Sequence, residues 1–318
     1  MNNRPTLYDI LETKKLIEPH IVRTPLHFYH TLSQELNAEI YVKHENHQVL
    51  GAFKVRGAVN VVSRLSESER ANGIISSSTG NFGQGIAYAA GIFGVDVHVV
   101  VPTNVNPGKA ESMRLLGADL ILHGNEFDEA RLYGEEIASR EGYRYIHSAN
   151  EPMLTAGTGT YTLEIMEDLP DVDVIIVPIG GGSGACGACI VAKSINPKVR
   201  VIGVQAEAAP AAYLSWKAGR VEEAPMKTAA EGLATGVGYE FTQSILRDLL
   251  DDFILVSESE LQKAMVMNLE KTHNLTEHAG SASLAAALKI KDELKDKKVA
   301  LVMSGGNVSI PQLLAALT

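Results

Sequence analysis

The chain has 318 residues, room for one large domain or two medium ones, and is 45% hydrophobic and 21% charged, as globular proteins are. Its formal net charge of −10 argues against nucleic acid as the main partner, because neutralising phosphates requires a basic face. No apolar run approaches the ~20 residues of a membrane helix, and the N-terminal segment lacks the apolar core of a secretory signal. The two cysteines allow at most one disulfide bond, which fits a reducing compartment, so we expect a cytoplasmic protein that does not enter a membrane.

Predicted strands and helices alternate along most of the chain. Residues 38–45 predict a strand, and residues 51–65 predict a loop that runs into a helix. A small parallel sheet follows, with strands at 73–78, 95–102, 118–124 and 143–148 and helices at 81–94, 106–117 and 126–142. The same pattern resumes with strands at 172–182, 199–207, 251–258 and 298–307. We therefore expect an α/β protein with two open parallel-sheet domains, a small one over 73–148 and a large one over 1–72 and 149–318.

A glycine-rich loop follows the β-branched run that ends at Ile179. Gly180, Gly181, Gly182, Ser183 and Gly184 lie between this predicted strand and a helix of small residues, an arrangement that suits a phosphate. From Gly182 the sequence also fits the dinucleotide pattern G-x-G-x-x-G, and Glu207 after the next strand offers the acidic residue that such a site uses. The loop by itself therefore leaves two cofactors open, a dinucleotide and a smaller monophosphate.

Lys54 lies between an aromatic residue and the start of a predicted helix, in GAFKVRGA. A lysine in such a position is commonly exposed and structural. Burial would lower its pKa from ~10.4, and only the neutral amine attacks a carbonyl. If Lys54 faces a cleft, it is a candidate for covalent attachment of a carbonyl compound.

The segment SSSTGNFGQG, residues 76–85, follows a predicted strand and opens a predicted helix. A capping residue would explain one polar side chain there, but the segment interleaves several with glycines. Hydroxyls, amides and free backbone N–H groups at a helix N-terminus suit a carboxylate. We expect a substrate carboxylate to bind here.

Three further features contain side chains that could carry chemistry. Ser304 ends a predicted strand before two glycines, which suits either a turn or a hydroxyl aimed into a cleft. Cys186 and Cys189 form a C-x-x-C, but their small neighbours indicate buried packing, and no nearby histidines complete a zinc site. Glu277 and His278 place a carboxylate next to an imidazole in the sequence, just before a glycine-containing helix start.

Four segments together resemble the fold type II pyridoxal-phosphate (PLP) enzymes, and most closely their serine/threonine dehydratase and serine racemase group. They are FKVRGA, SSSTGNFGQG, PIGGGSG and MSGGNV, in the family's order and at about its spacing, and the similarity extends from about residue 5 to the C-terminus. The resemblance implies two α/β domains with PLP in the cleft between them, as in the tryptophan synthase β-subunit. It also implies that water is eliminated from a β-hydroxy amino acid, and it suggests a homodimer.

The resemblance also implies roles for individual residues. Lys54 would bind PLP covalently and move the Cα proton, with Thr79 as a second catalytic hydroxyl. The cofactor-binding residues would be Lys54, Phe53, Asn81, Gly180, Gly181, Gly182, Ser183, Gly184 and Ser304. The substrate would be bound by Ser78, Thr79, Gly80, Phe82 and Gln84.

The sequence departs from the family pattern at three places. Phe82 stands where many relatives have His, which favours another β-hydroxy amino acid as an alternative substrate. Thr79 stands where racemases of the group have Ser, which argues against racemisation. Gln205 begins the segment that carries the group's divalent-cation site, so we expect no metal there. The sequence also leaves no room after Ser304 for the regulatory domain of biosynthetic threonine dehydratases, so we expect none.

The leading hypothesis is a PLP-dependent ammonia-lyase for L-threonine, L-serine or a related β-hydroxy amino acid, yielding a 2-oxo acid and ammonia. Alternatives are a dehydratase for a more specialised substrate such as hydroxyaspartate, phenylserine or a hydroxyectoine-pathway compound, and an amino-acid racemase. An NAD-dependent oxidoreductase is the alternative from another class. It leaves Lys54, residues 76–85 and Ser304 unexplained.

Overall fold

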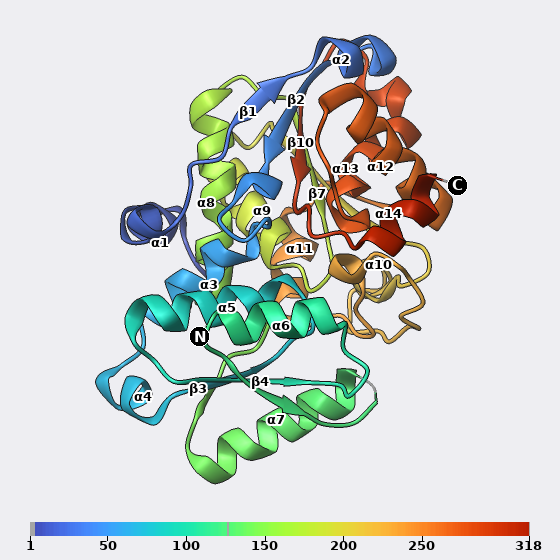
Figure 1. Cartoon of the computed structure of the whole chain (residues 1–318). Helices are drawn as coiled ribbons and strands as arrows, with labels where there is room; N and C mark the ends of the chain where they lie inside the picture. The colour runs from blue at the N-terminus through green and yellow to red at the C-terminus, as the bar shows by residue number, and fades with distance from the viewer. Residues whose placement is uncertain (1–3, 126, 318) are drawn as a thin grey trace.

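The computed structural model describes residues 4–125 and 127–317. Residues 1–3 and 318 of the predicted large domain, and residue 126 of the predicted small one, lie outside this description. Two separate sheets organise the molecule, one of six strands and one of four (Figure 1). Among the described residues, no helix has both the length and the apolar character that crossing a bilayer requires.

The larger sheet has the strand order β1-β2-β10-β7-β8-β9. Its strands are β1 (Leu26–Phe28), β2 (Glu39–His44), β7 (Val174–Pro178), β8 (Arg200–Ala206), β9 (Asp252–Val256) and β10 (Lys298–Met303). All neighbouring pairs are parallel except β1 and β2. The antiparallel edge strand β1 was not predicted, because a three-residue strand between a 3₁₀ turn and a helix gives no detectable alternation.

Both faces of the larger sheet are covered, which explains its continuously apolar strands. In β7, Ile175 and Val177 join one core cluster, and Val174 and Ile176 join the other, because successive side chains point to opposite faces. The first face is covered by α1 (Leu7–Ile17), α8 (Pro152–Asp168), α9 (Ser183–Ile195), α10 (Ala211–Ala218) and α11 (Glu240–Leu249). The second face is covered by α2 (His30–Leu36), α12 (Glu258–Thr272) and α13 (His278–Lys289).

Short elements complete this unit. They are the 3₁₀ turns η1 (Glu18–His20), η2 (Glu45–His47), η3 (Glu231–Leu233) and η4 (Lys291–Leu294), and the helix α14 (Ile310–Leu317). Figure 1 shows α14 beside α12 and α13, away from the smaller sheet.

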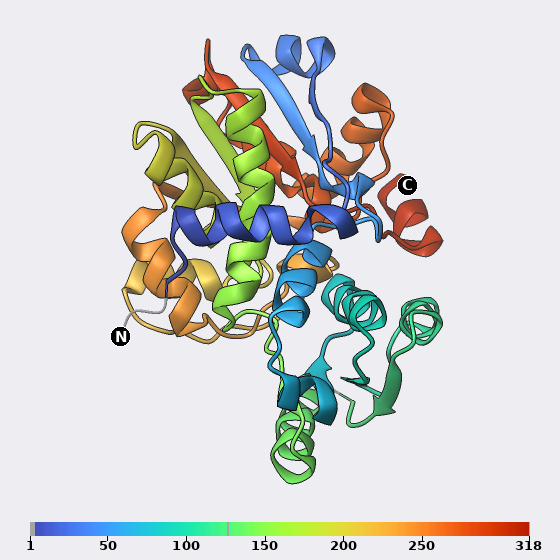
Figure 2. The same cartoon turned by 90° about the vertical axis from the view of Figure 1, so that its left-hand side faces the viewer.

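The smaller sheet is wholly parallel, with the order β5-β4-β3-β6. Its strands are β3 (Ile74–Ser77), β4 (Val97–Val101), β5 (Asp119–Leu122) and β6 (Arg144–Tyr145). Helices α3 (Lys54–Ser63), α5 (Asn81–Phe93) and α6 (Pro107–Leu115) contribute to the core on one side, and α7 (Phe127–Glu141) covers the other. The short α4 (Glu67–Asn72) leads into β3. Figure 2 shows this sheet and α7 below the larger unit.

Strand β6 is much shorter than the predicted run over 143–148. After Ile146 the chain turns, and the backbone N–H groups of Ala149 and Asn150 both donate to His147 Nδ1, at 2.9 and 3.0 Å. The histidine side chain thus accepts the backbone N–H groups that, in a longer strand, would donate to a neighbouring strand. The histidine therefore ends β6 early and begins the crossover to α8.

Helix α3 belongs in sequence to the predicted large domain, yet it packs into the smaller sheet's core. Val55, Val59 and Val62 join Ile74 and Ile86 in one hydrophobic cluster. The division at residues 72 and 149 stays a prediction. Lys54, the first residue of α3, therefore lies where the two units meet.

A buried ion network anchors α3 on its other side. The Arg56 guanidinium donates to both Glu45 and Glu164 at 2.7 Å, and Lys43 donates to Glu164 at 2.5 Å. Arg56, Glu45 and Lys43 are fully buried. Burial alone would raise the pKa of Glu164, but Arg56 and Lys43 hold it below its usual range. The network locks the helix that begins with Lys54.

Candidate functional site

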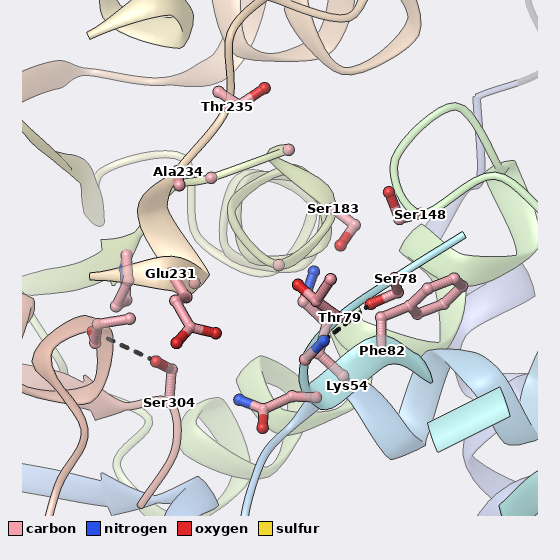
Figure 3. A pocket seen from close by; sticks show the side chains of 18 of the residues that line it. Lys54, Ser78, Thr79, Phe82, Ser148, Ser183, Glu231, Ala234, Thr235 and Ser304 are labelled. Atoms are coloured by element: carbon pink, nitrogen blue, oxygen red, sulfur yellow. Dashed lines mark hydrogen bonds between the residues drawn. The ribbon is translucent and has the colours of Figure 1, made fainter. Parts of the chain in front are cut away.

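The carboxyl ends of three strands from the two sheets converge on one cavity of about 280 Å³. The loop after β3, the glycine loop after β7 and Ser304 after β10 form its walls, together with the start of α3. Figure 3 shows Ser304 and Glu231 on one side and Ser78, Thr79 and Phe82 on the other. This is where parallel α/β sheets generally bind ligands.

The structure brings nearly all the predicted site residues to this cavity. Those that line it are Phe53, Lys54, Ser78, Thr79, Gly80, Asn81, Phe82, Gly180, Gly181, Gly182, Ser183, Gly184 and Ser304. Gln84 lies in the first turn of α5 and is not among the lining residues. Its contact with a substrate carboxylate stays a prediction.

The glycine loop forms a cradle at the N-terminus of α9. Gly182 has φ +98°, a left-handed conformation that side chains disfavour, and a Cβ on Gly180 would lie 2.4 Å from the Gly232 carbonyl oxygen. The hydroxyl of Ser183 is buried and has no hydrogen-bond partner within the protein. An unpaired buried hydroxyl and free N–H groups at a helix N-terminus fit an anion such as a phosphate.

Helix α8 fixes the orientation of this cradle from behind. Thr158 Oγ1 donates to the Ser183 carbonyl at 3.0 Å, and Tyr161 donates its phenolic hydrogen to the Gly184 carbonyl at 2.9 Å. Tyr161 is 1% exposed and also packs edge-on against Phe53, with ring centroids 5.9 Å apart. One tyrosine therefore touches both the anion cradle and the residue before Lys54.

Lys54 begins α3 beside the aromatic ring of Phe53, whose centroid lies 5.2 Å from Nζ. Loss of solvent lowers the pKa of Lys54 to about 8, although the nearby Glu277 carboxylate acts in the opposite direction. About a tenth of the amine is therefore neutral at pH 7, far more than for an ordinary lysine. A neutral amine in a cavity is a nucleophile for a carbonyl group.

Asn81 is held in one orientation by two residues of the larger unit. Its amide nitrogen donates to Glu277 Oε1 at 2.7 Å, and its amide oxygen accepts from Asn307 Nδ2 at 2.8 Å. Burial raises the pKa of Glu277 to about 7, while the Asn81 hydrogen bond lowers it. Asn81 therefore presents its remaining N–H at a fixed place on the cavity wall.

Ser304 is 5% exposed, and its hydroxyl donates to the Ala279 carbonyl at 3.4 Å. The backbone N–H of Phe53 donates to the Ser304 carbonyl at 3.1 Å, which brings the segment before Lys54 beside the end of β10. On the opposite wall, Ser78 and Thr79 precede α5, where free N–H groups suit a carboxylate.

Sequence reasoning left several cavity residues out of the predicted site. Among them are the polar residues Ser77, Lys109, Ser148, Glu231, Thr235, Tyr239 and Glu277. Glu277 had a visible signal, since it stands beside a histidine before a glycine-containing helix start. Lys109 and Glu231 had none, because each is a single charged residue in an ordinary polar segment.

The remaining sequence features lie away from the cavity or are structural. Cys186 and Cys189 are free and fully buried, and burial raises the pKa of both thiols. Glu207 is exposed and lies 3.4 Å from Lys289 on the surface. Gln205 is buried and accepts the Tyr213 backbone N–H at 3.0 Å. Across the described residues, no group of three or more His, Cys, Asp or Glu could hold a metal ion.

Comparison with known proteins agrees with this geometry. Residues 17–305 match the family described as pyridoxal-phosphate dependent enzyme. The chain is 42% identical over 306 residues to the L-threonine ammonia-lyase of Thermotoga maritima, covering 96% of this chain and 76% of that protein. It is 39% identical to the catabolic L-threonine dehydratase of Staphylococcus aureus strain N315, covering 97% of this chain and 90% of that protein.

Solved structures give the same result. Maize serine racemase superposes with a TM-score of 0.92 at 30% identity, covering 98% of this chain and 96% of that one. The processed form of threonine deaminase isoform 2 from Solanum lycopersicum superposes with a TM-score of 0.92 at 29% identity, covering 99% and 94%. The predictions of the α/β fold, of a PLP-dependent lyase and of PLP as the cofactor are confirmed, and the dinucleotide interpretation of the glycine loop is not supported. Because residues 17–305 match the family and the cavity holds Lys54 beside an anion cradle, the chain belongs to the pyridoxal-phosphate-dependent enzyme family.

Proposed function

We propose that this protein is an ammonia-lyase that converts L-threonine, and L-serine as a related substrate, to the 2-oxo acid and ammonia. Relatives named for threonine ammonia-lyase and threonine dehydratase activity, about 40% identical over most of the chain, support this activity. The observation that carries the proposal is Lys54, with its lowered pKa, in one cavity with the glycine cradle and the polar loop that precedes α5.

The residues of the cavity fit PLP. The glycine loop, the unpaired Ser183 hydroxyl and the N-terminus of α9 would hold the phosphate. Lys54 would bind the carbonyl carbon, Phe53 would lie against the ring, Asn81 would donate to the ring hydroxyl and Ser304 would face the ring nitrogen. When bound, PLP supplies a conjugated system that accepts the electron pair released at the substrate Cα.

The protein's own groups would then bind the substrate and move its protons. Ser78, Thr79 and Gly80, ahead of α5, would bind the substrate carboxylate. Lys54, once displaced by the substrate amine, would take the proton from Cα, and its pKa of about 8 suits this role at neutral pH. The Cα proton and the β-hydroxyl would together be lost as one water, and a second water would hydrolyse the remaining carbon–nitrogen bond to release the 2-oxo acid and ammonia.

Two cavity residues bear on the alternatives. In the sequence, Phe82 favoured an alternative substrate. In the structure it is 3% exposed and lines the cavity, where its ring takes up space that a bulky substrate side chain would need, and this supports a small substrate such as threonine. Thr79 lines the same wall and would have to carry the second proton of a racemase, where its methyl group hinders approach. Elimination is therefore proposed ahead of racemisation, although racemases of serine and of aspartate share the fold.

Capture of PLP by the apoenzyme should follow the titration of Lys54. Because only the neutral amine attacks, the rate constant should rise about tenfold per pH unit and level off above about pH 8, where the lowered pKa of Lys54 lies. Glu277→Gln should move the plateau to lower pH, because the Glu277 carboxylate raises the pKa of Lys54. Stopped-flow absorbance measures this rate constant. The same reaction of PLP with butylamine is the reference, because it corrects for the titration of the cofactor itself. A rate that still climbs through pH 10 would contradict the expectation.

Tyr161→Phe should weaken PLP binding while leaving the fold intact. The change removes one buried hydrogen bond to the Gly184 carbonyl, worth about 0.5–1.5 kcal/mol, so the dissociation constant should rise about two- to tenfold. Equilibrium dialysis of the apoenzyme against PLP measures the constant. Tyr8→Phe, at a 70% exposed position, is the control and should have no effect. Equal dissociation constants for the two variants would show that the Tyr161 hydroxyl does not contribute to PLP binding.

The activity itself is tested by titrating L-threonine into the purified holoenzyme and recording its visible absorption spectrum. A band that shifts while 2-oxobutyrate accumulates supports the proposal. A stable band that ignores threonine but responds to hydroxyaspartate or phenylserine would transfer the proposal to that substrate. A protein that gains no visible band when PLP is supplied would overturn it.

Cytoplasmic location and a homodimeric state are further parts of the proposal. Both rest on the resemblance and on the ordinary composition of the chain. Light scattering coupled to size-exclusion chromatography tests the second. A mass of one chain, 34.2 kDa, would contradict it.

A further inference from the structure

An ion pair joins the two units across the cavity wall. Lys109 lies in α6, which connects two strands of the smaller sheet, and Glu231 lies in η3 of the larger unit. Lys109 Nζ donates to Glu231 Oε2, and both residues line the cavity. The lysine side chain is 15% exposed and the glutamate side chain 46%, so the pair stands between the cavity and solvent.

The segment that carries Glu231 is firmly attached to the larger unit. The Glu258 carboxylate accepts from Thr228 at 2.5 Å and from the Ala229 N–H at 3.0 Å. Next to Glu231, the Gly232 carbonyl lies directly against Gly180 of the anion cradle. A contact from the smaller unit to Glu231 therefore also sets the distance between the smaller unit and the anion cradle.

The position of Lys109 in its helix indicates that the pair is specific. Asn106 caps α6 by accepting from the N–H groups of Gly108 and Lys109, which places Lys109 in the first turn. A cation there is disfavoured by the helix dipole, and the first turn of α6 contains no acidic residue. The Glu231 carboxylate compensates both the lysine charge and the helix N-terminus. The carboxylate that balances the charge of Lys109 in the smaller unit therefore belongs to the larger unit.

We propose that Lys109 and Glu231 are positioning residues that latch the smaller unit over the occupied cavity. The pair touches no reacting atom. It holds η3 against α6, and so keeps water from the cavity and Asn81 in reach of Glu277 and Asn307. The inference rests on the PLP site of the proposed function, but not on the identity of the amino acid.

The first test measures access to the bound cofactor. The fluorescence of PLP in the holoenzyme is quenched with acrylamide, a neutral probe that charge changes do not attract or repel. Glu231→Gln should raise the quenching constant up to about fivefold, the effect of removing an ion pair of up to ~1 kcal/mol. Asp171→Asn, which breaks the exposed pair of Asp171 with Lys298 on the larger sheet, is the matched control and should not change it.

The second test exchanges the charges. Lys109→Glu and Glu231→Lys should each raise the quenching constant. Each should also raise KM by a larger factor than it lowers kcat. The double variant, in which the two charges are exchanged, should return the quenching constant and KM most of the way to their wild-type values. High salt should raise the quenching constant of the wild type toward that of Glu231→Gln, because salt screens the ion pair. It should leave the quenching constant of Glu231→Gln nearly unchanged. A double exchange no better than the single changes, or Glu231→Gln with wild-type quenching, would overturn the latch. If threonine is not consumed, the proposed function fails while the quenching comparison still decides the latch.

Discussion

Lys54→Ala is expected to abolish covalent attachment of PLP and to lower lyase activity by on the order of 10³-fold or more. The variant removes both the amine that binds the cofactor and the proposed base at Cα, and proton transfer alone contributes about 10²- to 10⁴-fold. Borohydride reduction followed by peptide mass spectrometry should find the cofactor mass on the wild-type peptide containing Lys54 and on no peptide of the variant.

The glycine cradle should survive this substitution, because it is built from β7, α8 and α9 and not from α3. Lys54→Ala should therefore still bind PLP without a covalent bond, with an unchanged melting temperature for the apoenzyme. Lys298→Ala, at a surface lysine paired with Asp171, is the control and should keep the bound cofactor and the activity. A cofactor mass found on another lysine would refute the assignment of Lys54.

Arg56→Met should destabilise the protein by about 3–5 kcal/mol, although Arg56 lies outside the cavity. It leaves the buried carboxylates of Glu45 and Glu164 without their shared cation, and an unpaired buried charge costs far more than a lost surface pair. Because the pKa of Glu164 is lowered in the folded protein, its stabilising contribution is present at neutral pH. It is lost as the pH falls from the usual value of 4.5 through the lowered one.

Urea unfolding at pH 7 measures this loss, and Arg140→Met is the matched control. Arg140 pairs with Glu136 and Glu141 on the exposed side of α7, so its removal should change the unfolding free energy by less than about 0.5 kcal/mol. The difference between Arg56→Met and wild type should narrow below pH 4.5. Equal losses from Arg56→Met and Arg140→Met would show that the buried network contributes little to stability.

The cavity could be anticipated from the sequence because its main parts are local. A strand, a glycine turn and a helix N-terminus follow one another in the chain, so residues 180–184 and 78–81 indicate anion sites by their own residue types. Parallel strands also place their carboxyl ends at one edge, which brings the β3, β7 and β10 loops together whatever the details of packing.

Other parts of the site depend on contacts between distant segments. The orientation of Asn81 is set by Glu277 and Asn307, 196 and 226 residues away in the chain. The Tyr161 hydroxyl reaches Gly184 from a helix whose sequence resembles any buried helix. No local pattern distinguishes such residues, because their partners are chosen by the packing of helices.

The α/β class, the anion cradle and the candidate nucleophile could all be predicted from the amino-acid order, since propensity, glycine placement and strand–helix alternation act over a few neighbouring residues. Long-range packing is responsible for most of the remaining features. It added the edge strand β1, packed α3 against both units and paired Lys109 with Glu231 across the cavity wall. Strand β6, by contrast, ends early because of local hydrogen bonds to the His147 side chain. Burial, charge compensation and the lowered pKa of Lys54 all arise when segments far apart in the chain exclude water from a shared space.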